Sequence, residues 1–148
     1  MDMRAVIKAQ MGQTLPFVRH NGIEITEVGD GVGEAVFAQT ENSLNHVNSQ
    51  HAGGLFTVGE AASGAAMSGL FADQILNIRP LAAGASIRYT KIAKGDITAR
   101  AKVDGDAAAL RDSLASDGRV SFPVEVELTD VDGNTVAHMT VDWSVKKV

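Results

Sequence analysis

Residues 52–72 read AGGLFTVGEAASGAAMSGLFA, and this stretch decides the fold. Alanine, glycine and serine dominate it, and Glu60 is its single charged residue. The stretch is long enough to span a membrane, but a spanning helix is richer in leucine and isoleucine and seldom carries a central carboxylate. We therefore expect a helix from about Gly53 to Phe71 that is buried within the protein, with no membrane as its partner.

Glycines recur along this stretch at positions 54, 59, 64 and 69. In a helix interior each one costs up to about 1 kcal/mol relative to alanine. Small side chains offset this cost when they allow a neighbouring backbone to lie close against the helix. We therefore expect the helix to be surrounded on most sides, by a curved sheet and by a second helix.

The chain before this helix predicts one short helix and one hairpin. Residues 1–17 carry apolar side chains at helical spacing, with Pro16 near the end of the predicted helix. Alternating apolar residues then predict strands at 23–28 and 32–40, joined by a glycine-rich turn. Residues 41–50 are rich in asparagine and serine and should form a loop.

The chain after the central helix predicts most of the sheet. A connection over residues 77–84 should lead into the following elements: strands at 85–93, 97–103, 120–128 and 135–145, and a short helix at 106–115. The order of elements indicates an α+β fold, with a long central helix wrapped by a mostly antiparallel six-stranded sheet. At 148 residues the chain suits one domain spanning residues 1–148.

Composition narrows the class of function. With no cysteine and four separated histidines, neither a disulfide framework nor a metal site is expected. A net charge of −5 and few aromatic residues argue against nucleic acid as a partner. The first residues lack the apolar segment of a signal peptide, so we expect a cytoplasmic protein.

Glu60 is the candidate catalytic residue. An unpaired carboxylate in a buried helix costs several kcal/mol or takes up a proton. Two interpretations stay open. Glu60 could reach water or a strand and be purely structural, or it could sit in a pocket with a raised pKa as a general base.

The segment before the helix is the second candidate. Residues 45–54 read NHVNSQHAGG, so small residues begin the helix and expose backbone N–H groups at its positive end. Such donors can stabilise an oxyanion, although ordinary capping explains small residues there equally well. Glu60 lies about 12 Å beyond Ala52 along a helix axis, too far for one carbonyl to contact both. A two-fold dimer with antiparallel helices would bring them together, so we expect a homodimer or a homotetramer built as a dimer of dimers.

At these residues the sequence resembles the hotdog-fold acyl-CoA thioesterases, most closely the PaaI-like, phenylacetate-pathway type. That family has an asparagine, a His-Gly-Gly six residues later, and an acidic residue nine positions after the histidine. Asn45, His51 and Glu60 match this spacing without gaps. Gly53 matches the second glycine, and Ala52 stands where the first would be, which preserves a backbone N–H. The resemblance covers about residues 15–146.

The resemblance implies a hotdog fold and hydrolysis of an acyl-coenzyme A thioester. Glu60 would activate water or attack the carbonyl directly. The N–H of Ala52 or Gly53 would form the oxyanion hole. Asn45 would orient water or the carbonyl, and His51 would support the loop or contact the thioester oxygen.

No cofactor is implied beyond coenzyme A as part of the substrate. Residues 89–96 resemble the end of the family's third strand, with Ile92 in place of its usual proline. Basic residues are in surplus between positions 77 and 103, so Lys91 and Lys94 are expected near the coenzyme A phosphates, unless they belong to a solvated strand face.

A serine or threonine that helps to hold the attacking water in some relatives has no clear counterpart. Ala82 falls near that position, and Ser86 is the nearest hydroxyl. Two other functions stay open: a hydratase or dehydratase, and a non-catalytic domain that binds acyl groups.

Overall fold

A computed structural model describes all 148 residues. Its helices are α1 (Met3–Thr14), α2 (Pro16–His20), α3 (Ala52–Leu70) and α4 (Ala107–Asp117). Its strands are β1 (Ile23–Val28), β2 (Val32–Phe37), β3 (Ile78–Tyr89), β4 (Ile97–Val103), β5 (Arg119–Thr129) and β6 (Thr135–Lys147). Two short 3₁₀ helices, Glu41–Ser43 and Ala72–Asn77, flank α3 along the chain.

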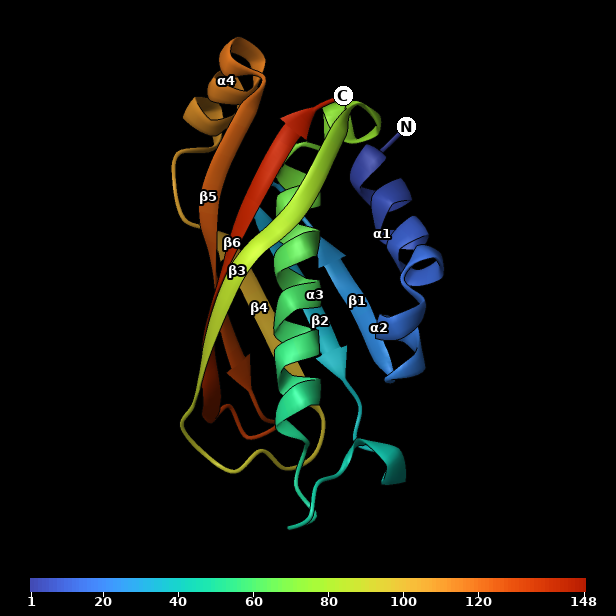
Figure 1. The fold of residues 1–148 in the computed structure, drawn as a ribbon. Coiled ribbons are helices and arrows are strands. Elements are labelled where there is room, and N and C mark those ends of the chain that lie inside the picture. The colour runs from blue at the N-terminus through green and yellow to red at the C-terminus, as the bar shows by residue number, and fades with distance from the viewer.

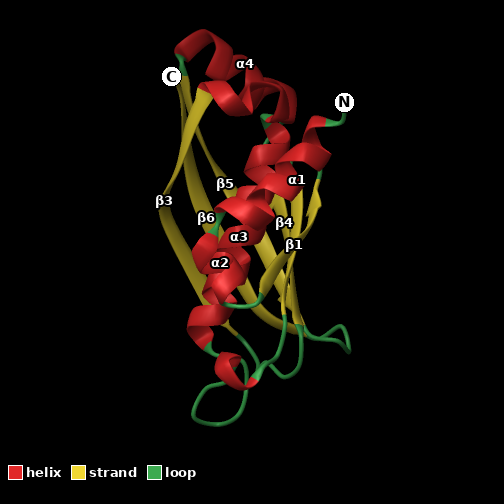
Figure 2. Ribbon diagram, turned by 90° about the vertical axis from the view of Figure 1, so that its right-hand side faces the viewer, coloured by secondary structure: helices red, strands yellow, loops and turns green.

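The six strands form one antiparallel sheet in the order β1-β2-β4-β5-β6-β3. The sheet curves around α3. The N-terminal helices α1 and α2 lie beside β1, on the side of α3 opposite β3 (Figures 1 and 2). This is the hotdog arrangement, so the predicted fold class is confirmed.

The central helix is the most deeply buried element. Every residue from Ala61 to Ala72 is buried, and α3 begins and ends within one residue of its predicted limits. A side chain at Gly54 would overlap the Phe37 ring, and one at Gly69 would overlap the Gly29 carbonyl. The expected close approach of the sheet therefore occurs at both ends of the helix.

Charged groups complement the C-terminal end of α3. The carbonyl of Gly69 accepts a hydrogen bond from Arg4 Nε at 3.1 Å, and that of Leu70 accepts one from Arg111 Nε at 3.0 Å. Both guanidinium groups also pair with Asp30. These cations satisfy terminal carbonyls and interact favourably with the negative end of the helix dipole.

The N-terminal region differs from its prediction. One helix over residues 1–17 was expected, but the helix breaks at Leu15 and Pro16 begins a second helix, α2. Proline fits the first position of a helix because its missing N–H has no intrahelical acceptor there. Pro16 thus ends one helix and starts the next, which leaves α2 against the start of β1.

The predicted connection over residues 77–84 is wrong. These residues form the first half of β3, which starts at Ile78 and ends at Tyr89, before the predicted end at 93. β3 is an edge strand paired only with β6, and most of its residues are exposed on both faces. Such a strand has no buried face to impose alternation, and an edge position tolerates Pro80.

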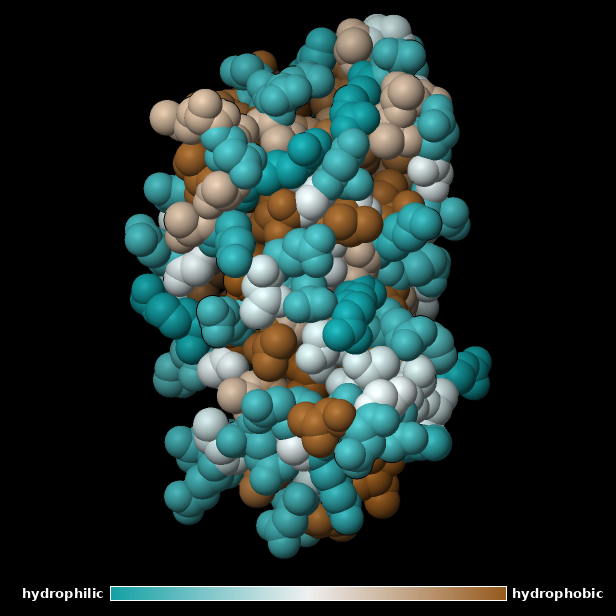
Figure 3. Space-filling model, turned by 180° about the vertical axis from the view of Figure 1, so that it is seen from behind, coloured by the Kyte–Doolittle hydropathy of each residue, from teal (hydrophilic) through white to brown (hydrophobic).

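The outer face of the sheet is exposed to solvent. β4 shows the pattern directly, because its odd-numbered residues are buried and its even-numbered residues are not. Seen from behind, this face is mostly hydrophilic with scattered hydrophobic side chains (Figure 3). No helix is long and apolar enough to cross a membrane.

Candidate active site

The start of α3 is capped by a histidine. His51 precedes the helix in an extended conformation, and its Nδ1 accepts a hydrogen bond from the Gly53 N–H at 2.8 Å. The N–H groups of Gly54 and Leu55 donate to the His51 carbonyl. The Ala52 N–H donates to no acceptor in the chain. Of the two expected oxyanion donors, Ala52 therefore offers a free N–H.

Asn45 organises the loop before this helix. Its Oδ1 accepts from the N–H groups of Val47 and Ser49, each at 3.0 Å, and its Nδ2 donates to Ser49 Oγ at 2.9 Å. Asn48 takes a left-handed conformation within the same turn, with φ 58°. Both polar atoms of the Asn45 amide are thus used within the loop, which holds the loop and His51 in place.

Gln50 joins this loop to the segment after β3, a contact that no sequence pattern indicated. Its N–H donates to the Ala93 carbonyl at 2.8 Å, and its Nε2 donates to the Gly95 carbonyl at 3.0 Å. Its buried Oε1 has no partner. Tyr89 adds a second link, because its hydroxyl donates to the Ala52 carbonyl at 3.1 Å.

These hydrogen bonds hold the segment that contains Lys91 and Lys94 near the start of α3. Lys91 and Lys94 are exposed and lie on the segment that Gln50 and Tyr89 tie to the start of α3. They are therefore close to the Ala52 end of the helix. Ser86 lies in a separate groove with His138 that does not include Glu60.

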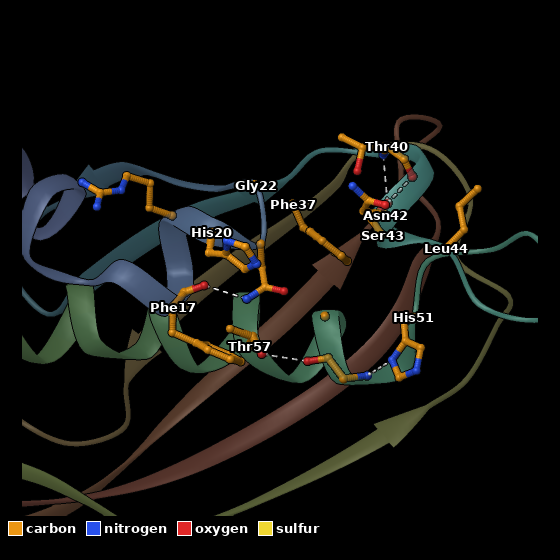
Figure 4. A pocket seen from close by; sticks show the side chains of 14 residues that line it. Phe17, His20, Gly22, Phe37, Thr40, Asn42, Ser43, Leu44, His51 and Thr57 are labelled. Atoms are coloured by element: carbon orange, nitrogen blue, oxygen red, sulfur yellow. Dashed lines mark hydrogen bonds between the residues drawn. The ribbon is translucent and has the colours of Figure 1, made fainter.

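A polar pocket opens beside the start of α3 (Figure 4). It has a volume of about 530 Å³ and lies between α2, the loop after β2 and the first turn of α3. Arg19 and His20 are among its lining residues. His51 and Thr57 border it on the side of α3 (Figure 4). Its lining suits a polar, negatively charged molecule.

Glu60 faces a different environment. Its side chain is half-buried, and its carboxylate forms no hydrogen bond or ion pair within the chain. Burial raises the pKa of Glu60 above its ordinary value, because the charged form loses hydration. No strand group pairs with Glu60, so of the two structural interpretations only contact with water remains.

Two apolar pockets meet at Glu60. The outer apolar pocket has a volume of about 410 Å³ and is lined by Phe17, Phe56 and Thr57, among others. The inner apolar pocket has a volume of about 250 Å³ and runs between α1 and α3 toward Trp143. The polar pocket and the outer apolar pocket share Phe17 and Thr57, so the three form a continuous series along α3.

The structure brings together only part of the predicted site. Asn45, His51, Ala52 and Gly53 lie together at the start of α3. Glu60 lies on the same helix but about 12 Å further along its axis. No group of three or more histidine, cysteine or acidic side chains lies close enough to hold a metal ion.

A protein-family model matches nearly the whole chain. The family model described as "Domain of unknown function (DUF4442)" matches residues 3–145, almost the whole chain. The chain belongs to this DUF4442 family. No curated protein matches the chain in sequence.

Solved structures share the fold of this DUF4442 domain. A Pseudomonas aeruginosa protein of unknown function and probable thioesterase, PA5026, is similar over 97% of this chain and 95% of its own, with 23% identity and a TM-score of 0.84. The Escherichia coli PaaI protein from the phenylacetic acid degradation operon is similar over 98% and 94%, with 19% identity and a TM-score of 0.74. A Staphylococcus aureus thioesterase enzyme, SAV0944, is similar over 88% and 98%, with 16% identity and a TM-score of 0.73. The resemblance to the PaaI-like proteins is thus confirmed at the level of the fold.

Proposed function

We propose that this protein hydrolyses an acyl-coenzyme A thioester to the free acid and coenzyme A. The observation that carries the proposal is the isolated carboxylate of Glu60 at the junction of two apolar pockets. A desolvated carboxylate without a partner is a stronger proton acceptor than an exposed one. The fold shared with a probable thioesterase and with a thioesterase enzyme supports the same reaction.

Glu60 and Ala52 have different roles in the proposed reaction. As a general base, Glu60 takes a proton from water while the water oxygen attacks the thioester carbon. The free Ala52 N–H stabilises the oxyanion, aided by the positive end of the helix dipole. Collapse of the intermediate expels the coenzyme A thiolate, which leaves as the thiol after protonation. As a nucleophile, Glu60 would form an anhydride that water then hydrolyses to the same products.

The separation of Ala52 from Glu60 requires two chains. We therefore propose a homodimer in which the start of α3 in one subunit lies beside Glu60 of the other. β3 supports this arrangement, because no charged residue interrupts it between Arg79 and Arg88 and most of its residues are exposed. It lies at the edge of the sheet (Figure 1). The opposite edge strand, β1, carries exposed Glu24 and Glu27, and such charges discourage pairing with another chain.

Thiol release from a panel of acyl-coenzyme A substrates tests the proposal. Glu60→Gln keeps the shape of the side chain but removes the basic oxygen, so kcat should fall by about 10²–10⁴-fold. Glu24→Gln, the same change on an exposed strand, is the matched control. A folded Glu60→Gln protein with near-normal turnover would rule out this mechanism. A wild-type protein that binds acyl-coenzyme A without thiol release would instead indicate a binding domain.

A further inference from the structure

Three cations lie side by side on the outer face of the sheet. Lys146 of β6 is directly opposite Arg79 of β3 on one side and Arg119 of β5 on the other. All three residues are exposed, and residues paired in this way point to the same face of a sheet. Arg79, Lys146 and Arg119 are called the cationic row. None of them forms an ion pair with an acidic side chain.

Cations near the middle of the same face lie opposite anions. Arg100 of β4 is in register with Glu34 of β2 and Glu127 of β5, and it forms an ion pair with Glu34 at 3.1 Å. Lys102 of β4 is in register with Glu125 of β5. Opposite charges on neighbouring strands stabilise a sheet, and like charges directly opposite one another destabilise it. The cationic row therefore lowers the stability of the free protein, although the chain as a whole is acidic, with a net charge of −5.

Two hydroxyl groups lie beside the cationic row. Ser144 of β6 and Ser121 of β5 form the next pair on the outer face, two residues along from Lys146 and Arg119. Arginine donates parallel hydrogen bonds to a phosphate, lysine adds a compact positive charge, and serine hydroxyls donate to further oxygens. The cationic row and the two serines therefore offer positive charge and hydrogen-bond donors to a ligand with several phosphate oxygens.

The cationic row is at the opposite end of the sheet from the start of α3. β3 and β5 begin at this end and β6 finishes there, whereas α3 begins at the other end (Figure 1). Lys91 and Lys94 follow the far end of β3. Within one subunit, the row is thus separate from the lysines expected near coenzyme A.

We propose that the cationic row binds a small molecule that carries two or more phosphate groups. Such a ligand neutralises charges that repel one another in the free protein, so its binding recovers the stability that the row costs. The phosphates belong either to coenzyme A or to a separate phosphorylated metabolite, and the chemistry of recognition is the same for both. This inference goes beyond the proposed hydrolysis and does not depend on it, because phosphates bind whether or not a thioester is cleaved.

Binding of pyrophosphate to the full chain tests the proposal. Lys146→Gln removes the central cation and keeps a long polar side chain, and Lys102→Gln is the matched control on the same face. In calorimetry at low ionic strength, the wild type should bind pyrophosphate, and Lys146→Gln should bind it about fivefold more weakly, the loss typical of one exposed ion pair. Lys102→Gln should change the affinity little, and high salt should weaken binding to the wild type.

The melting temperature provides a second measurement, in which the variant changes in the opposite direction. Without ligand, Lys146→Gln should melt above the wild type because repulsion within the row is relieved, and Lys102→Gln should not, because it loses the attraction to Glu125. Pyrophosphate should raise the melting temperature of the wild type and raise that of Lys146→Gln less. A lysine that is merely solvated would produce neither difference.

Competition with coenzyme A distinguishes the two sources of phosphate. If coenzyme A displaces pyrophosphate from the wild type, the row holds the phosphates of coenzyme A; if it does not, the row holds a separate phosphorylated metabolite. A wild type that does not bind pyrophosphate, or an equal affinity in Lys146→Gln, would overturn the inference. So would a Lys146→Gln protein that changes its oligomeric state and keeps its affinity for pyrophosphate, because the row would then be a contact between subunits.

Discussion

The first two N–H groups of α3 are not equivalent. Gly53 donates to His51 Nδ1 and so satisfies the helix cap, while Ala52 has no acceptor. A donor that is already paired must break its bond before it can stabilise an oxyanion, whereas a free donor is preorganised. Because Nδ1 accepts from the Gly53 N–H, a neutral His51 ring carries its proton on Nε2.

Ala52→Pro tests this assignment by removing the free N–H. Ala52 is the first residue of α3, where proline is tolerated, and His51 at φ −65° and ψ 137° already has the extended conformation preferred before proline. We expect kcat to fall about 10²–10³-fold with little change in melting temperature. Ala52→Gly keeps the N–H and serves as control. Equal turnover in the two variants would assign the oxyanion to another donor.

Glu60 also predicts how stability depends on pH. Burial raises the pKa of Glu60 in the folded state above that in the unfolded chain. Between these two pKa values the folded protein binds more protons than the unfolded chain, so stability falls as pH rises through this window and then levels off. Glu60→Gln lacks this titration. Its stability relative to wild type should therefore grow with pH across the window, and parallel denaturation curves at all pH values would contradict the prediction.

At the scale of single residues, the sequence could predict the candidates but not their bonds. The spacing of Asn45, His51 and Glu60 marks the polar groups around the start of α3. The pairing of His51 with Gly53 depends on a side-chain rotamer, and the role of Gln50 depends on a contact with residues 93–95 far along the chain. Neither follows from spacing, so neither could be predicted.

At the scale of elements, burial decided which predictions held. The run of small apolar residues located α3 within one residue at each end. Apolar alternation located β1 and the start of β2, although β2 ends at Phe37 and not at the predicted residue 40. β3 was mislocated because an edge strand exposed on both faces has no apolar alternation. The exposed edge of β3 also leaves backbone N–H and C=O groups free to pair with another chain.

The segment after β3 carries a prediction about the two lysines. Partial desolvation raises the pKa of Asp130, but hydrogen bonds from Asn134 and Asp132 and the charge of Lys91 hold it below its ordinary value. Neither lysine forms an ion pair, but Lys91 lies near enough to Asp130 to lower the pKa of that carboxyl, and no such effect involves Lys94. For coenzyme A phosphates, Lys94 should contribute more than Lys91.

Steady-state kinetics at low and high salt measures this difference. Lys94→Ala should raise KM up to about fivefold at low salt with little change in kcat, since an exposed ion pair contributes at most about 1 kcal/mol and binds substrate and transition state alike. Lys91→Ala should raise KM less, and high salt should shrink both effects. Lys102→Ala, at an exposed position on β4, is the control. An unchanged KM in the Lys91→Ala, Lys94→Ala double variant would assign both lysines to the solvated surface.

At the scale of the whole molecule, one helix holds both halves of the proposed site. A rigid helix cannot bring Ala52 and Glu60 to one carbonyl, because they lie about 12 Å apart along its axis. In the proposed homodimer, a two-fold axis beside α3 would remove this conflict and create two equivalent sites, each with Ala52 from one subunit and Glu60 from the other. The β3 edge is the surface available for such pairing.

Complementation between two inactive variants tests the shared site. Glu60→Gln lacks the base, and Ala52→Pro lacks the oxyanion donor, so each homodimer should be inactive. A mixed dimer has one site that carries both substitutions and one that carries neither. After random exchange of subunits half of the dimers are mixed, so activity should return to about one quarter of the wild-type value. If Ala52 and Glu60 acted within one chain, every site would lack one group and mixing would restore nothing. The mixture that recovers activity should sediment at twice 15.5 kDa. Ala85→Asp on β3 should abolish both the dimer and the recovered activity. Ala108→Asp on exposed α4 is the control and should leave the dimer and the recovered activity intact.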